Sequence, residues 1–106
     1  MSTTILVKSE KDNGDTLELV KSAVEAEITR LTLALEMAEK RLLPYEKKYH
    51  VDSEYFLVNF AAEDLEGGDE EYVSWAGEYK LKQSLQNKIV QLREIEYAHS
   101  EILQSD

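Results

Sequence analysis

Residues 51–71, VDSEYFLVNFAAEDLEGGDEE, decide how this chain folds, because they separate two long segments of helical pattern. The stretch holds both phenylalanines of the chain, one tyrosine and eight carboxylates, with no lysine or arginine. The whole chain has a formal net charge of −10, so most of its surplus negative charge lies here. A connection this rich in aromatic and acidic side chains predicts a local apolar core with an acidic exterior.

The stretch itself predicts a short helix over 52–64. Asp52 is a good N-cap, because its carboxylate can accept hydrogen bonds from backbone N–H groups that lack helical partners. Val51 and Phe56 have the spacing of a hydrophobic staple. The pair Gly67-Gly68 is a strong helix breaker and ends this element. The expected apolar face consists of Phe56, Leu57, Phe60 and Ala61.

The preceding segment predicts a long helix over 16–49, started by Asp15 or Thr16 as cap. Apolar residues recur there at heptad spacing, which lines one face of a helix. Proline removes one backbone donor, yet the heptad continues in phase beyond Pro44, so we expect a kink rather than an end. The heptad residues are Leu17, Val24, Leu31, Ala38 and Tyr45 at one position, and Ile28, Leu35, Leu42 and Tyr49 at the other.

The following segment predicts a second long helix over 69–104. Asp69 is its expected N-cap, and Glu70 and Glu71 in the first turn complement the positive end of the helix dipole. No glycine or proline follows Gly77. The expected apolar stripe comprises Tyr72, Trp75, Ala76, Tyr79, Leu81, Leu85, Ile89, Leu92, Ile95, Ile102 and Leu103, and His99 also stands at a core-facing position.

Together these elements predict a mainly α fold, a long antiparallel helical hairpin with a short connecting helix. Eight of the nine aromatic residues lie between Tyr45 and Tyr79, at the closed end of the hairpin. Beyond that end two helices bury little apolar surface, so we expect the open arms to pair with another subunit, a dimer being favoured, or with a partner.

The N-terminal arm, residues 1–15, contains TILVK at 4–8, which has the composition of a short strand, followed by the polar turn KDNGD. A strand needs a neighbour. We expect none elsewhere in the chain, so the strand pairs with its copy in a dimer or adds to a partner's sheet.

Length and composition narrow the function. A chain of 106 residues predicts a single domain, and the absence of cysteine favours a reducing cytoplasm. No apolar run is long enough to span a membrane, and the start lacks the pattern of a signal peptide. The net charge of −10 disfavours nucleic-acid binding and favours a basic protein as partner.

Other kinds of site find little support in the residues. A strand before helices is typical of ribbon-helix-helix DNA readers, but the first helix lacks their early turn. The acidic loop does not have EF-hand spacing, because the sixth position from Asp64 is Asp69 rather than glycine. Neither His50, in a turn, nor His99 has further metal ligands at the spacing of a metal site, or a nucleophile at the spacing of a catalytic site. We therefore expect no enzyme, metal or cofactor.

The segment of about 40–86 resembles small helical bacterial and archaeal proteins on the antitoxin side of type II toxin-antitoxin pairs. The pattern is a helix ending in Tyr-Glu-x-x-Tyr, a Ser-x-x-Phe helix, an acidic Gly-Asp turn and a Trp-containing helix. His50 stands where these proteins often have glycine. The matching positions are Tyr45, Glu46, Tyr49, Ser53, Phe56, Gly68, Asp69, Trp75 and Tyr79.

The resemblance implies an antitoxin-like neutraliser of a small basic toxin. Acidic side chains would steer the encounter, and Phe60 and Trp75 would anchor it, unless Trp75 belongs to the core. The alternative is a self-associating helical structural or adaptor protein. The acids expected to contact the partner are Glu63, Asp64, Glu66, Asp69, Glu70 and Glu71.

Overall fold

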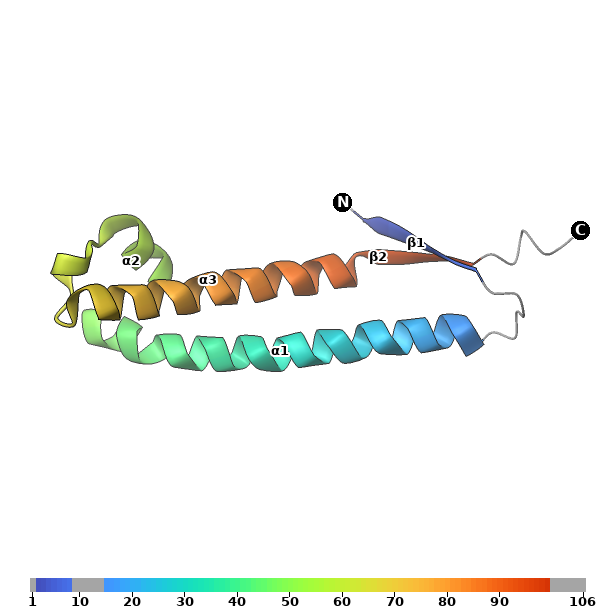
Figure 1. The fold of residues 1–106 in the computed structure, drawn as a ribbon, viewed down its shortest axis with the longest axis horizontal. Helices are drawn as coiled ribbons and strands as arrows, with labels where there is room; N and C mark the ends of the chain where they lie inside the picture. The colour runs from blue at the N-terminus through green and yellow to red at the C-terminus, as the bar shows by residue number, and fades with distance from the viewer. Residues whose placement is uncertain (1, 9–14, 100–106) are drawn as a thin grey trace, which may run out of the picture. The chain divides into compact units, whose positions relative to one another are not determined.

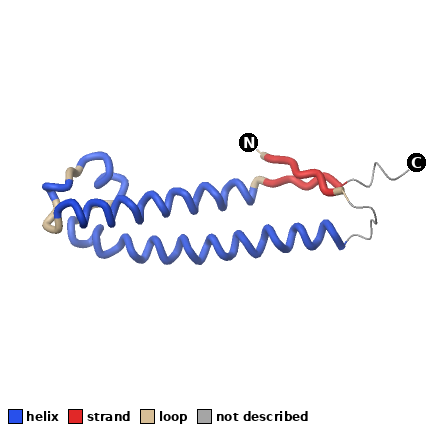
Figure 2. Tube along the Cα trace, viewed as in Figure 1, coloured by secondary structure: helices blue, strands red, loops and turns tan. Residues whose placement is uncertain are grey.

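The computed structural model describes residues 2–8 and 15–99 and has three α-helices and two short strands in them (Figures 1 and 2). In chain order these are strand β1, helices α1, α2 and α3, and strand β2, with one turn of 3-10 helix between α2 and α3. Their bounds are β1 Thr3–Val7, α1 Asp15–Tyr49, α2 Ser53–Asn59, the 3-10 turn Ala62–Asp64, α3 Gly68–Arg93 and β2 Ile95–His99.

The predicted helical hairpin is confirmed: α1 packs on α3 with α2 in the connection. The contacts divide the chain into two compact units. The unit Thr32–Gln86 contains the end of α1, all of α2 and most of α3, and we call it the closed unit. The other unit combines Met1–Leu31 with Asn87–Asp106, and we call it the strand unit.

Local signals in the sequence set the ends of the helices in the closed unit. Helix α1 passes through Pro44 and ends at Tyr49. His50 follows with a φ of 56°, in the left-handed region that favours glycine. The Asp52 carboxylate caps α2 as predicted, accepting a hydrogen bond of 2.8 Å from the Tyr55 N–H.

The connecting helix is shorter than predicted. Instead of continuing to Asp64, α2 gives way at Phe60, whose backbone is extended. A 3-10 turn then spans Ala62–Asp64, and α3 begins at Gly68 rather than being capped by Asp69. At this extended residue the Phe60 ring contacts Phe56 and Trp75 of the aromatic core.

Two predictions about the ends of the chain are wrong. The second long helix ends at Arg93, and Ile95–His99 form strand β2. The N-terminal strand has a partner within the chain after all, because β1 pairs with β2 in parallel, with Thr3 opposite Ile95 and Val7 opposite His99. Ile95 fits the helical stripe, but together with Tyr97 it also fits an alternating strand pattern, and pairing with β1 selects the strand.

Some expectations lie outside the described residues. These are residues 11–14 of the polar turn after the first strand, and the predicted helix over 100–104 with Ile102 and Leu103. Asp15 and Thr16, the predicted caps of the first long helix, instead lie inside the first turn of α1. Among residues 2–8 and 15–99, no helix combines the length and hydrophobicity needed to cross a membrane.

The heptad of α1 accounts for much of the buried apolar surface. Ala38 and Leu42 are buried in the closed unit, and Ile28 and Leu31 in the strand unit. Pairs of opposite charge join α1 and α3 in the closed unit, among them Arg41 with Glu78 at 2.8 Å and Lys82 with Glu39 at 3.9 Å. One apolar cluster of buried residues, in the closed unit, consists of Leu42, Phe56, Leu65, Trp75 and Ala76.

Candidate functional site

The closed end is built around the indole of Trp75, which has no exposed surface. Phe56 stacks on it, with ring centroids 3.7 Å apart and an interplanar angle of 3°. Tyr45 and Tyr49 also stack with it, at 5.4 and 5.6 Å, while Phe60 approaches edge-on at 6.4 Å. Such pairs add to the apolar area that they bury, so Trp75 is the centre of this core. The idea that it anchors a partner is not supported, because its ring is inaccessible.

A buried polar chain satisfies the one donor of that indole. Trp75 Nε1–H donates to Ser53 Oγ at 2.8 Å, and Ser53 Oγ donates to Glu46 Oε2 at 2.7 Å. The Ser53 N–H donates to the same Glu46 oxygen at 3.0 Å. A buried indole N–H without an acceptor would cost free energy, so this chain fixes how α1, α2 and α3 meet.

Sequence reasoning did not assign these roles to Ser53 and Glu46. Both belong to the pattern on which the antitoxin resemblance rests, but neither was predicted to touch the other or Trp75. Ser53 is only 2% exposed. A serine directly after the Asp52 cap is common at helix starts, and only the fold brings it to an indole from α3. The shared pattern therefore describes how the closed end folds.

A second network holds the glycine turn between the 3-10 turn and α3. The Tyr49 hydroxyl donates to Glu71 Oε1, and the Gly67 N–H donates to the same oxygen at 3.0 Å. The Tyr49 oxygen in turn accepts the Glu66 N–H at 2.9 Å. A Cβ at Gly67 would lie 2.7 Å from the Glu71 Cβ, so this close approach requires glycine. We call this arrangement the Glu71 clasp.

Lys48 adds charge to the clasp. Its Nζ lies 3.0 Å from Glu71 Oε2 and 3.2 Å from Glu66 Oε2. The hydrogen bond from Tyr49, followed by those from Gly67 and Lys48, lowers the pKa of Glu71 against the effect of burial. Hydrogen bonds to Glu71 and then Glu66 raise the pKa of Lys48. Burial, reinforced by Glu71, raises the pKa of Tyr49.

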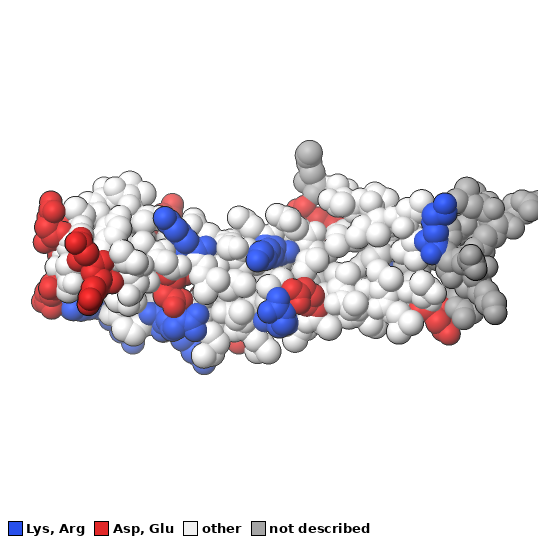
Figure 3. Space-filling model, in the orientation of Figure 1, with Lys and Arg blue, Asp and Glu red and all other residues white. Residues whose placement is uncertain are grey.

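The acids predicted to contact a partner therefore fall into two groups. Glu71 is half-buried and engaged in the clasp, and Asp64 accepts the Ala61 N–H at 2.8 Å across the 3-10 turn. Glu63, Asp69 and Glu70 are exposed, as is Glu66, whose side chain is 79% exposed despite its ion pair. Figure 3 shows acidic side chains gathered over the α2 end of the hairpin. We call Glu63, Glu66, Asp69 and Glu70 the acidic end.

Exposed apolar side chains accompany the acidic end, and sequence reasoning missed them. Val58 is 77% exposed and Tyr55 is 53% exposed, three residues apart on the outer side of α2. Val73, one turn after Asp69 on α3, is 68% exposed. Phe60 is half-buried, between the core and the Tyr55 ring. The exposure of Val58 could have been predicted, because this residue falls outside the apolar face predicted for the short helix.

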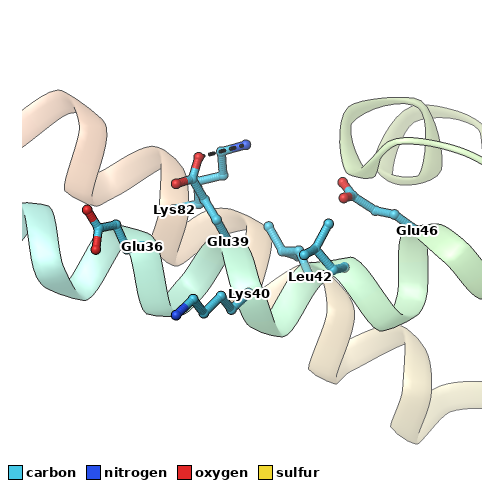
Figure 4. A pocket seen from close by; sticks show the side chains of 7 residues that line it. Glu36, Glu39, Lys40, Leu42, Glu46 and Lys82 are labelled. Atoms are coloured by element: carbon cyan, nitrogen blue, oxygen red, sulfur yellow. Dashed lines mark ion pairs between the residues drawn. The ribbon is translucent and has the colours of Figure 1, made fainter.

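Two shallow grooves run between α1 and α3 in the closed unit. One has a volume of about 370 Å³, and Figure 4 shows its mixed charges, including the Lys82–Glu39 pair. The other, of about 660 Å³, contains the Arg41–Glu78 pair and Tyr45. Among the described residues, no group of three or more His, Cys, Asp or Glu side chains is placed to hold a metal ion. Both grooves are lined by acidic and basic side chains together, an arrangement that does not indicate a reactive centre.

Comparison of the chain with models of known protein families, with curated proteins and with solved structures finds no match. The antitoxin resemblance accordingly stays a prediction.

Proposed function

We propose that this chain is a non-enzymatic protein-binding module whose acidic end engages a basic protein. The favoured partner is a small basic toxin, which the chain would neutralise by covering its surface. The observation that carries the proposal is the pairing of exposed apolar side chains, Val58 and Val73, with exposed carboxylates on a rigid support.

That combination has the anatomy of a binding surface. Apolar side chains at the centre of an interface supply most of the binding free energy, and a polar rim supplies orientation and encounter rate. The closed end carries eight acids and no lysine or arginine over 50–71, so its field attracts a basic surface. The aromatic core and the Glu71 clasp hold this surface in one conformation, which lowers the entropy lost on binding.

The first test is growth of a host that carries the adjoining gene, induced alone and then together with this chain. If a short basic product of that gene is toxic and this chain restores growth, neutralisation is supported. If the product is harmless, or toxicity persists while this chain is well expressed, neutralisation is wrong.

A charge-reversal pair then locates the surface. The variant E63K/D69K/E70K should lose rescue, because it reverses three exposed acids of the closed end. The matched control E18K/E25K/E36K changes the net charge equally at exposed positions of α1 and should still rescue. Equal loss in both variants would mean that only the total charge matters.

The alternative function is a self-associating helical structural or adaptor protein. Leu33 and Met37, one turn apart on α1, favour it because they are 59% and 52% exposed. Salt separates the two functions. Binding steered by acids and bases weakens as ionic strength rises, whereas association through apolar surfaces does not.

A further inference from the structure

The outer side of α3 presents apolar residues on both sides of a glycine. Val73 and Leu81 lie four residues before and after Gly77, so all three share one helical face. Val73 is 68% exposed and Leu81 is 42% exposed. A Cβ added to Gly77 would have no atom of another segment within 4 Å. We call these three residues the Gly77 stripe.

Nothing within the described chain requires a glycine at this position. Gly77 does not have a positive φ, and no neighbouring segment approaches it closely. Glycine is among the least favourable residues in a helix interior. Where the fold itself does not need glycine, its remaining structural use is to let another backbone come close.

The charges of α3 change sign beside Gly77. Residues 68–78 carry four acids and no base, whereas residues 79–93 carry four bases and no acid. The helix dipole favours such charges only in the first and last turns, yet Glu78 and Lys80 stand near the middle of the helix. Glu71, Glu78 and Lys82 pair with α1 of the same chain, so the charges that bear on a second copy are Asp69 and Glu70 in one half and Lys80, Lys88 and Arg93 in the other. Two antiparallel copies of α3 would place these acids of each helix toward the basic half of the other.

We propose that two copies of this chain associate through α3, antiparallel, around a two-fold axis at Gly77. Val73 of one copy then packs beside Leu81 of the other, because each lies four residues from the axis. The same patch serves both subunits, as a two-fold interface requires. Ridges of residues four apart interlock at a crossing angle of about −50°. The proposal does not require a basic partner, although it uses Val73, Asp69 and Glu70, which the proposed function also uses.

The charge pattern also selects the second copy and its direction. A parallel arrangement would bring acids against acids and bases against bases. A single crossing of two helices buries less than the roughly 1,200 Å² typical of stable interfaces. We therefore expect a dimer that forms with rising concentration and dissociates on dilution.

Disulfide trapping tests the geometry, because the chain contains no cysteine of its own. Under mild oxidation, Gly77→Cys should form a covalent dimer at least tenfold faster than Leu43→Cys. Leu43 is a matched control, since it is 47% exposed on α1 of the same unit. Equal rates for the two variants would overturn the proposal.

The register has its own test. In an equimolar mixture of Val73→Cys and Leu81→Cys proteins, the mixed disulfide should make up well over half of the covalent dimers, since about half is the share that random pairing gives. Predominance of the Val73→Cys self-pair would indicate a parallel arrangement and overturn the proposal. Circular dichroism checks that each variant is folded. The unmodified chain should also show concentration-dependent sedimentation, and a monomer up to about 200 µM would contradict the dimer.

Discussion

The closed unit and the strand unit are held together in different ways. In the closed unit, residues between Tyr45 and Tyr79 meet around one buried indole, and the rings that surround it lie 15 to 30 residues from it, from Phe60 to Tyr45. In the strand unit, β1 and β2 join residues near opposite ends of the chain, with Thr3 opposite Ile95. The first arrangement rests on side-chain packing, and the second on a backbone ladder between distant segments.

This difference teaches where the stability of the chain lies. Aromatic side chains bury large areas, and each pair contributes beyond the area term. A two-stranded sheet is marginal by itself in water, and forming it closes a long loop. Lys21 lies over the Tyr97 ring at 5.6 Å and adds one contact between α1 and β2. We therefore expect the closed unit to be more stable than the strand unit and to unfold after it.

The largest expected effect comes from removing the central ring. Trp75→Ala should destabilise the closed unit by about 3–5 kcal/mol, because it leaves a cavity lined by Phe56 and Tyr45. Urea unfolding followed by circular dichroism measures the loss. A loss below about 1 kcal/mol would show that the two units do not differ as described.

The polar chain under Trp75 should have the next largest effect. Ser53→Ala leaves the indole N–H without its acceptor, so we expect a loss of about 1–3 kcal/mol in the free energy of unfolding. Trp75→Phe removes the donor and the need for the acceptor together. In that background Ser53→Ala should cost less, and an unchanged cost would contradict the coupling between the two residues.

The Glu71 clasp predicts a dependence on acid. The folded pKa of Glu71 lies below its ordinary value of 4.5, so its contribution is complete above that value and is lost as pH falls through the folded pKa. The urea midpoint should therefore decrease as the pH falls below 4.5, and Glu71→Gln should flatten this dependence. An equally steep decline in Glu71→Gln would assign the effect to other carboxylates.

A smaller effect of opposite sign is expected at the end of α1. His50 has a φ of 56°, which costs an L residue about 1 kcal/mol. His50→Gly should therefore raise the free energy of unfolding by about 0.5–1 kcal/mol, since glycine adopts this conformation without strain. Thermal unfolding of His50→Gly and His50→Ala decides the point. Equal melting temperatures would mean that the left-handed turn is not strained.

The smallest effect on the closed unit should follow a break in the strand pair. The Thr3 N–H faces the Glu94 carbonyl at 3.4 Å, and alternation puts the Ile5 N–H on the same side. Ile5→Pro removes that donor and should expose the β2 amides to hydrogen exchange. Protection of α2 should be unchanged. Loss of protection in both regions would show that the units unfold together.

The sequence was sufficient for the presence of three helices and for the antiparallel order of the two long ones, but not for the ends of α2 and α3. Heptad spacing, the Asp52 cap and Gly67-Gly68 are local signals, which act between neighbouring residues whatever the tertiary fold. They placed α1 and the start of α2 nearly as observed. They were also sufficient to place a strand near the N-terminus, since β-branched residues favour strands.

Local signals were insufficient where two patterns fit one segment. Ile95 suits the predicted helical stripe and also, alternating with Tyr97, a strand, and only pairing with β1 decides between them. Local signals were also insufficient to predict the roles of residues in the candidate site. The exposed acids could be read from composition, but Trp75 could be read as core or as anchor, and its burial settled that question.

By itself, then, the amino-acid sequence determined the helical elements, the aromatic closed end and the concentration of negative charge, because each depends on residue type and short spacing. Only the tertiary structure decided which acid is engaged and which is exposed, since Glu71 and Glu70 are neighbours in sequence with opposite surroundings. It also joined Ser53 to Trp75 and β1 to β2. Such pairings depend on distances between segments that no local pattern encodes.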